Sequence, residues 1–209
     1  MLGVCKYLFV RYEIVLSGYL LVFYSSSFTR PYANKLRKVY HSYPDDPDVA
    51  FFFAESLMVI NAWKLYEYPT GEPTSPDANE IKKVLEHALE ISPNHPGLCH
   101  LYIHLAEMCP TPEISLDACR ILREDYPFIG HLLHMPTHID VLIGDYNSCV
   151  EFNKRALESD KVLMKHSPTT SGPFGFYFGY MAHNYHMLVY GALMGGMKDV
   201  ALATAGKAT

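Results

Sequence analysis

The sequence has few of the residues that build a covalent scaffold or a strongly charged surface. It has five cysteines in 209 residues and no CxxC pair, which fits neither a disulfide framework nor a thiolate zinc site. Reduced, mostly buried thiols are therefore expected. Charged residues make up 19% and the net charge is −5, so no basic face is implied and nucleic acid is not an expected partner. Hydrophobic residues make up 49%, which predicts a globular chain.

Long apolar runs are also scarce, and the one near the N-terminus is short. The uncharged segment IVLSGYLLVFYSSSF begins with a largely apolar run of 11 residues, fewer than the about 20 that a membrane-spanning helix needs. We expect residues 1–28 to be a signal or anchor segment, a buried helix of an incomplete repeat, or a non-native N-terminus. Residues 29–209 are expected to form the folded domain. A cytoplasmic location is favoured unless residues 1–28 are a signal peptide or an anchor, and only an anchor implies a membrane.

A repeat period of about 34 residues runs through the chain. Pro93 and Pro127 follow helix-like patterns and mark one such period, and one more leads to Lys161. The step from Pro44 to Pro93 is longer, and the Pro/Gly/Thr-rich segment 63–76 can supply the difference as a loop. Apolar residues at spacings of three and four predict a helix before each anchor. The clearest of these stripes are Ile81, Leu85, Ala88 and Leu89, and Tyr146, Cys149, Val150, Asn153, Ala156 and Leu157.

This period, the GDY turn and the endings ALEISP and ALESDK resemble tetratricopeptide repeats. The stretches YPDDPDVAFFFAESLM, HPGLCHLYIHLAE and GHLLHMPTHI are also similar to a bacterial-type group of such proteins, from about residue 31 to residue 209. The resemblance implies an all-α fold of antiparallel helix pairs, about three and a half of them, stacked into a right-handed superhelix. It also implies that the first helix of each pair lines a concave groove that binds ligands. The chain ends after ATAGKAT without a polar capping helix, so more repeats are expected in a longer protein.

Histidines recur in phase with this period. Counted from each anchor proline, candidate ligands stand at +4, +7, +11 and +14. At about 100° per residue, these offsets share one stripe of a helix, roughly 80° wide. Stripes of stacked helices lie side by side, so we expect one groove to collect these residues. They are Glu55 after Pro44; His100, His104 and Glu107 after Pro93; His131, His134 and His138 after Pro127; and His183 and His186, which repeat the spacing of His131 and His134.

The chemistry of these side chains favours a transition metal. Neutral imidazole binds Fe, Cu, Mn and Zn, and carboxylates can ligate the ion or orient a histidine ring. His100/His104 and His134/His138 are i,i+4 pairs that can chelate from one helix face. The histidines exceed the needs of one four-coordinate ion, so two ions, or one ion and substrate-binding imidazoles, fit better. His104, His138 and His134 are the first ligands we expect. No HExxH motif is present, so a zincin-type protease is not supported.

Three functions remain open from the sequence. The favoured one is a repeat protein that binds a transition metal through the histidines and glutamates of its groove. A metal-dependent enzyme, oxidative or hydrolytic, is the second and needs an open coordination position. The third is a metal-free scaffold that docks a helix or an extended peptide. The expected partner is accordingly a protein, a peptide or a small-molecule substrate in the groove.

Pro136 interrupts the pattern of the histidine-rich helix. Proline removes a backbone hydrogen bond and clashes with the preceding turn of a helix. Residues 131–138 therefore form a kinked helix, or else His131 and His134 lie on a loop that enters a helix beginning near Pro136.

Overall fold

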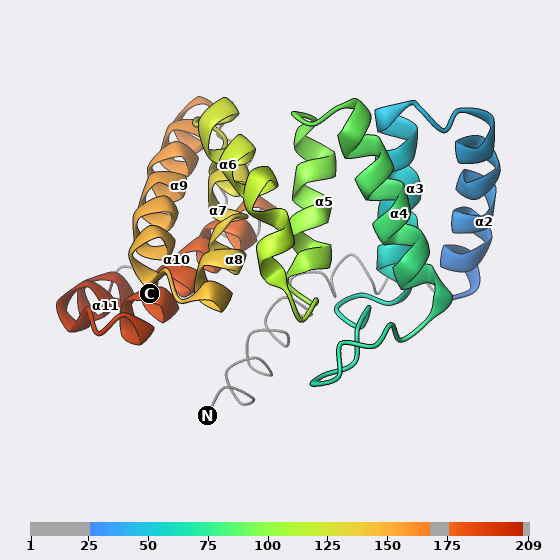
Figure 1. The fold of residues 1–209 in the computed structure, drawn as a ribbon. Coiled ribbons are helices and arrows are strands. Elements are labelled where there is room, and N and C mark those ends of the chain that lie inside the picture. Colours follow the sequence, from blue (N-terminus) through green and yellow to red (C-terminus); the bar gives the residue numbers. More distant parts are fainter. Residues whose placement is uncertain (1–25, 168–175, 207–209) are drawn as a thin grey trace. The chain divides into compact units, whose positions relative to one another are not determined.

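The protein is mainly α-helical in a computed structural model that describes residues 26–167 and 176–206 (Figure 1). The only extended pairing within these residues is an isolated bridge between Tyr66 and Pro73, which confirms the all-α class. Within the same residues, no helix is both long enough and apolar enough to cross a membrane. Most of the predicted N-terminal segment 1–28 lies outside the described residues.

The chain divides into two compact units with the boundary between Pro93 and Asn94. In the first unit, α3 packs against both α2 and α4, and the core includes Phe53, Leu57, Ile81 and Leu85. The predicted loop is confirmed, since residues 61–75 between α3 and α4 contain no helix. The helices of this unit are α2 (Ser26–Ser42), α3 (Pro47–Ile60) and α4 (Pro76–Ile91).

Proline marks the beginning of helices in both units. Pro47 begins α3, and the side chain of Asp46 caps that helix by accepting hydrogen bonds from the backbone of Asp48 and Val49. His95 caps α5 in the same way from the residue before Pro96. The proline ring presets the backbone angle of the first helical turn, where its missing N–H costs no hydrogen bond. The anchor prolines Pro44 and Pro93 lie in the turns that precede these two helices.

The second unit (residues 94–209) carries most of the histidines. Helix α9 lies against α7, α8 and α10, and α5 packs against α6 and α8. The stripe predicted on α9 is largely confirmed, because Cys149, Val150, Asn153, Ala156 and Leu157 are buried. The elements are α5 (Pro96–Ala106), a short 3-10 helix η1 (Pro112–Ser115), α6 (Leu116–Asp125), α7 (Gly130–His134), α8 (Thr137–Ile143), α9 (Tyr146–His166), α10 (Phe176–Met194) and α11 (Lys198–Ala205).

The interruption at Pro136 separates α7 from α8. Met135 and Pro136 keep right-handed helical backbone angles between the two helices, and the backbone N–H of His138 bonds to the carbonyl of Met135 at 3.2 Å. Of the two alternatives, the kinked helix is therefore correct, and His131 and His134 lie on α7.

The described cysteines are reduced thiols, as the sequence predicts. Cys99, Cys119 and Cys149 are buried, whereas Cys109 is only partly buried. Burial raises the pKa of Cys119 and of Cys149 to about 12. These thiols are therefore protonated core residues at neutral pH.

Candidate metal centre

Most of the predicted site residues meet in one network within the second unit. They come from α5 and the residue after it, from α7 and α8, and from α10, so side chains far apart in the sequence are neighbours in space. Neighbouring rings in the network have centroids between 4.4 and 6.0 Å apart. The members are His100, His104, Glu107, His131, His134, His138 and His183.

Three histidines at the buried end of this network are close enough to hold a metal ion. His134, His138 and His183 each offer a ring nitrogen, and these nitrogens all lie within 4.8 Å of one another. All three side chains are buried. We call these three residues the His134 group.

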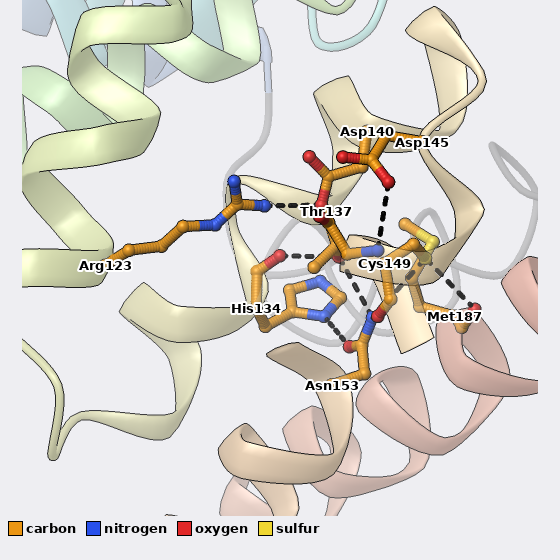
Figure 2. A network of polar contacts seen from close by, with 9 residues as sticks. Arg123, His134, Thr137, Asp140, Asp145, Cys149, Asn153 and Met187 are labelled. Atoms are coloured by element: carbon orange, nitrogen blue, oxygen red, sulfur yellow. Dashed lines mark hydrogen bonds and ion pairs between the residues drawn. The ribbon is translucent and has the colours of Figure 1, made fainter. Parts of the chain in front are cut away.

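Asn153 fixes which nitrogen of His134 carries the proton (Figure 2). The Nδ2 atom of Asn153 donates to Thr137 Oγ1 at 3.1 Å and to the Cys149 carbonyl at 2.8 Å. Its Oδ1 is therefore the acceptor that faces His134 Nδ1 at 2.7 Å. A neutral imidazole that donates through Nδ1 keeps a lone pair on Nε2. His134 thus presents an unprotonated Nε2 to its neighbours.

Glu107 fixes His138 and His104 in the same tautomer. Its Oε2 accepts a hydrogen bond from His138 Nδ1 at 2.6 Å, and its Oε1 accepts one from His104 Nδ1 at 2.8 Å. Burial alone would raise the pKa of Glu107, but the adjacent His138 and His104 hold that pKa far below its ordinary value. Glu107 is therefore a carboxylate. Hydrogen bonds of this kind orient metal-bound imidazoles in proteins and make them more basic.

The two fixed tautomers bring two lone pairs face to face. Nε2 of His134 lies 3.0 Å from Nε2 of His138, and neither nitrogen carries a proton when both Nδ1 atoms donate. Such a contact repels unless a proton or a cation lies between the nitrogens. Burial, followed by the charges of His183 and His138, lowers the pKa of His134 well below its ordinary value. A proton on His134 is therefore disfavoured, and a metal ion bound by both nitrogens would remove the repulsion.

The separation of these nitrogens also suits chelation. Zn–N bonds of about 2.0–2.1 Å place two ligands about 3.3 Å apart at a tetrahedral angle and about 2.9 Å apart at a right angle. The observed 3.0 Å lies between these values. The two imidazoles can bind one ion without a large movement of either ring.

The remaining imidazoles form a second group beside the first. Nε2 of His100 lies 3.2 Å from Nε2 of His131, and the rings of His100 and His104 are 4.7 Å apart. Burial lowers the pKa of His131 to about 3 and that of His100 well below its ordinary value. Both rings are therefore neutral. We call His100, His104 and His131 the His100 group.

Two predicted site residues do not join these groups. His186 lies on α10 after His183, and it is only partly buried. Glu55 is an exposed residue on α3 of the first unit. That Glu55 faces the same groove stays a prediction. His104, expected among the first ligands, lies outside the His134 group and is linked to it through Glu107.

Sequence reasoning missed the polar residues that hold the histidines in place. Asn153 was assigned only to an apolar stripe, although a buried amide in such a stripe is itself a signal of a polar network. Asp160 continues that stripe and accepts hydrogen bonds from Tyr177 Oη and Asn184 Nδ2, each at 2.7 Å. Because Asn184 follows His183, this carboxylate ties α9 to the segment of α10 that carries a candidate ligand.

Helix α8 is held by an ion pair at its buried face (Figure 2). Asp140 on α8 pairs with Arg123 on α6, and the guanidinium of Arg123 also lies 4.1 Å from the ring centroid of Phe152 on α9. His138 is therefore carried by a helix that is fixed to two others.

Comparisons with known proteins add no assignment to this geometry. No family model matches the sequence, and no curated protein or solved structure matches it at a significant level. Any functional assignment therefore depends on the residues and contacts described above.

Proposed function

We propose that this protein binds a first-row transition metal ion through His134, His138 and His183. The observation that carries this proposal is the 3.0 Å contact between Nε2 of His134 and Nε2 of His138, because Asn153 and Glu107 already occupy both Nδ1 protons. His183 lies within reach of the same ion. Neutral nitrogen donors suit Fe, Cu and Zn, whereas Mg²⁺ and Ca²⁺ prefer oxygen.

We also propose that the helices form a tetratricopeptide-like superhelix and that the metal centre lies on its concave face. Support comes from the order of packing in the second unit, where α5 packs on α6, α8 on α9, and α10 on α11. Candidate ligands lie on α5 or just after it, on α7 and α8, and on α10, which precede α6, α9 and α11 along the chain. A shared groove built in this way would collect one set of ligands from each repeat.

A metal-dependent enzyme is the second candidate. It is favoured by the number of imidazoles in the His134 group, since three protein ligands leave a coordination position for water or substrate. In that function the ion would polarise a bound substrate or lower the pKa of a bound water molecule. Assays of hydrolysis and oxidation on the metal-loaded protein would separate an enzyme from a metal-binding protein.

Metal content tests the proposed function directly. We would purify the untagged protein, reconstitute it with Zn²⁺, Fe²⁺, Cu²⁺ or Mn²⁺ and measure bound metal by elemental mass spectrometry. At least one equivalent of bound metal per chain is expected. The double variant His134→Ala/His138→Ala should lose the ion that the His134 group binds. The control variant is His166→Ala, because His166 is an exposed histidine of the same unit. Absence of bound metal after every reconstitution would refute the proposal and favour a metal-free scaffold.

Asn153 is expected to control the affinity of the His134 group. In Asn153→Leu, His134 Nδ1 loses its acceptor, and metal affinity should fall by about 10–100-fold, as for other partners of metal-bound histidines. Competition with a chromophoric chelator measures this change. Asn147→Ala alters an exposed amide on the same helix and should leave the affinity unchanged. Equal affinities of Asn153→Leu and the unsubstituted protein would show that this hydrogen bond does not orient a ligand.

A further inference from the structure

We propose that a second transition metal ion binds beside the first, at His100, His104 and His131, and that Glu107 is shared by the two sites. This inference deepens the proposed function and rests on it. The centre would then hold two ions, the first at the His134 group and the second at the His100 group.

The His100 group resembles the His134 group in its pair of facing imidazoles, although among the described residues only the His134 group brings three ligand nitrogens within 4.8 Å of one another. In each group two imidazoles meet through Nε2, at 3.2 Å for His100 and His131 and at 3.0 Å for His134 and His138. Each pair has a third ring beside it. His104 lies 4.7 Å from His100, and His183 lies 4.4 Å from His134, between ring centroids.

Glu107 connects the two groups through its two oxygens. Oε2 accepts from His138 and Oε1 accepts from His104. Since its Nδ1 donates to Glu107, His104 keeps a lone pair on Nε2, as His138 does. One buried carboxylate thus orients one imidazole of each group by a hydrogen bond, and its negative charge lies beside both proposed sites.

The contact between His100 and His131 does not satisfy both ring nitrogens of His131. If His131 Nε2 donates to His100, then His131 Nδ1 is a lone pair without a donor. If His100 donates, then His131 Nδ1 carries a proton without an acceptor. In either tautomer Nδ1 of His131 is buried and has no hydrogen-bond partner among the described residues. His131, unlike His134, therefore lacks a complete set of hydrogen bonds. This favours a bound ion beside the rings of His100 and His131.

The two sites would be immediate neighbours. The rings of His104 and His138 are 5.7 Å apart, and those of His131 and His134 are 6.0 Å apart. Each of these distances joins one member of the His100 group to one member of the His134 group. Both ions would therefore lie within one cluster of imidazoles, with the carboxylate of Glu107 offsetting part of their charge.

Titration of the full chain with Zn²⁺ against a chromophoric chelator tests this inference. The unsubstituted protein should bind two equivalents, and His100→Ala/His131→Ala should bind one. A single equivalent in the unsubstituted protein that is lost in His134→Ala/His138→Ala, but kept in His100→Ala/His131→Ala, would overturn the second site and leave the proposed function standing. No bound Zn²⁺ in the unsubstituted protein, and none of the other three ions after reconstitution, would overturn both.

A second pair of variants tests the shared carboxylate and does not depend on the folding of the histidine variants. Glu107→Gln should weaken both binding steps by about 10–100-fold, because it removes the negative charge beside both sites and replaces one accepting oxygen with an amide nitrogen that cannot accept a hydrogen bond. Asn153→Leu should weaken only one step, because Asn153 contacts only His134 among the candidate ligands. Weakening of a single step by Glu107→Gln would contradict a carboxylate shared by two ions.

Discussion

Saturation with Zn²⁺ is expected to raise the melting temperature of the protein by about 8–16 °C. An ion that binds only the folded state at about 1,000 times its dissociation constant adds about 4 kcal/mol to the free energy of unfolding. For a chain of this size each kcal/mol corresponds to about 2–4 °C. The effect should be large because the Nε2 atoms of His134 and His138 lie 3.0 Å apart, a contact that a bound ion would convert into two bonds.

Calorimetric melts with Zn²⁺ and with a chelator would measure this shift. The double variant His134→Ala/His138→Ala should lose the part of the shift that the ion of the His134 group contributes, whereas His166→Ala should keep the whole shift. Addition of excess chelator to the Zn²⁺-loaded protein should return the melting temperature to the apo value. An equal shift in the double variant would assign the stabilisation to ions bound elsewhere on the protein.

The second large effect is expected at Gly130, the first residue of α7. A Cβ atom at this position would lie 1.9 Å from Asp160 Oδ1 and 2.9 Å from the Ala156 carbonyl oxygen. Both Gly130 and Asp160 are buried. Gly130→Ala should therefore lower the free energy of unfolding by about 3 kcal/mol, at the upper end of the usual cost of overpacking. The side chain of Asp160 cannot retreat without leaving Tyr177 and Asn184.

Urea denaturation of Gly130→Ala would measure this loss. The matched control is Gly206→Ala, where the nearest atom to a new Cβ is the Leu202 carbonyl oxygen at 3.8 Å. That substitution should change the free energy of unfolding by less than about 0.5 kcal/mol. Because Gly130 precedes His131, the variant should also bind metal more weakly. Equal stabilities of the two variants would show that α7 can move away from α9 at little cost.

The sequence predicted much of the candidate centre because the spacing of residues on a helix determines the face on which their side chains lie. Equal offsets from Pro93 and Pro127 assign His104 and His138 to the same angle on their helices, and the centroids of these two rings lie 5.7 Å apart. The offsets of His100 and His131 differ, so the contact between those two rings did not follow from equal offsets. The helix stripes on residues 81–88 and 149–157 were predictable for the same reason. In both helices the apolar spacing marks the face that is buried.

The parts that the sequence did not predict depend on contacts between helices. Angular phase placed His186 with His183, yet only His183 lies within reach of His134 and His138. The role of Asn153 required knowing that α9 lies against α7, since its partner His134 is 19 residues away. Likewise, the spacing predicted that Glu107 lies on the same helix stripe as the histidines. It did not predict the two hydrogen bonds by which Glu107 accepts from both His104 and His138.

The burial of the thiols has a consequence for how the protein would tolerate oxidants. Thiolates are the form of cysteine that peroxides and disulfides attack, and burial raises the pKa of Cys119 and Cys149 to about 12. The candidate ligands of both ions are imidazoles, which do not enter thiol–disulfide exchange. Mild peroxide or oxidised glutathione should therefore leave the donor set intact, unlike that of a cysteine-ligated zinc site.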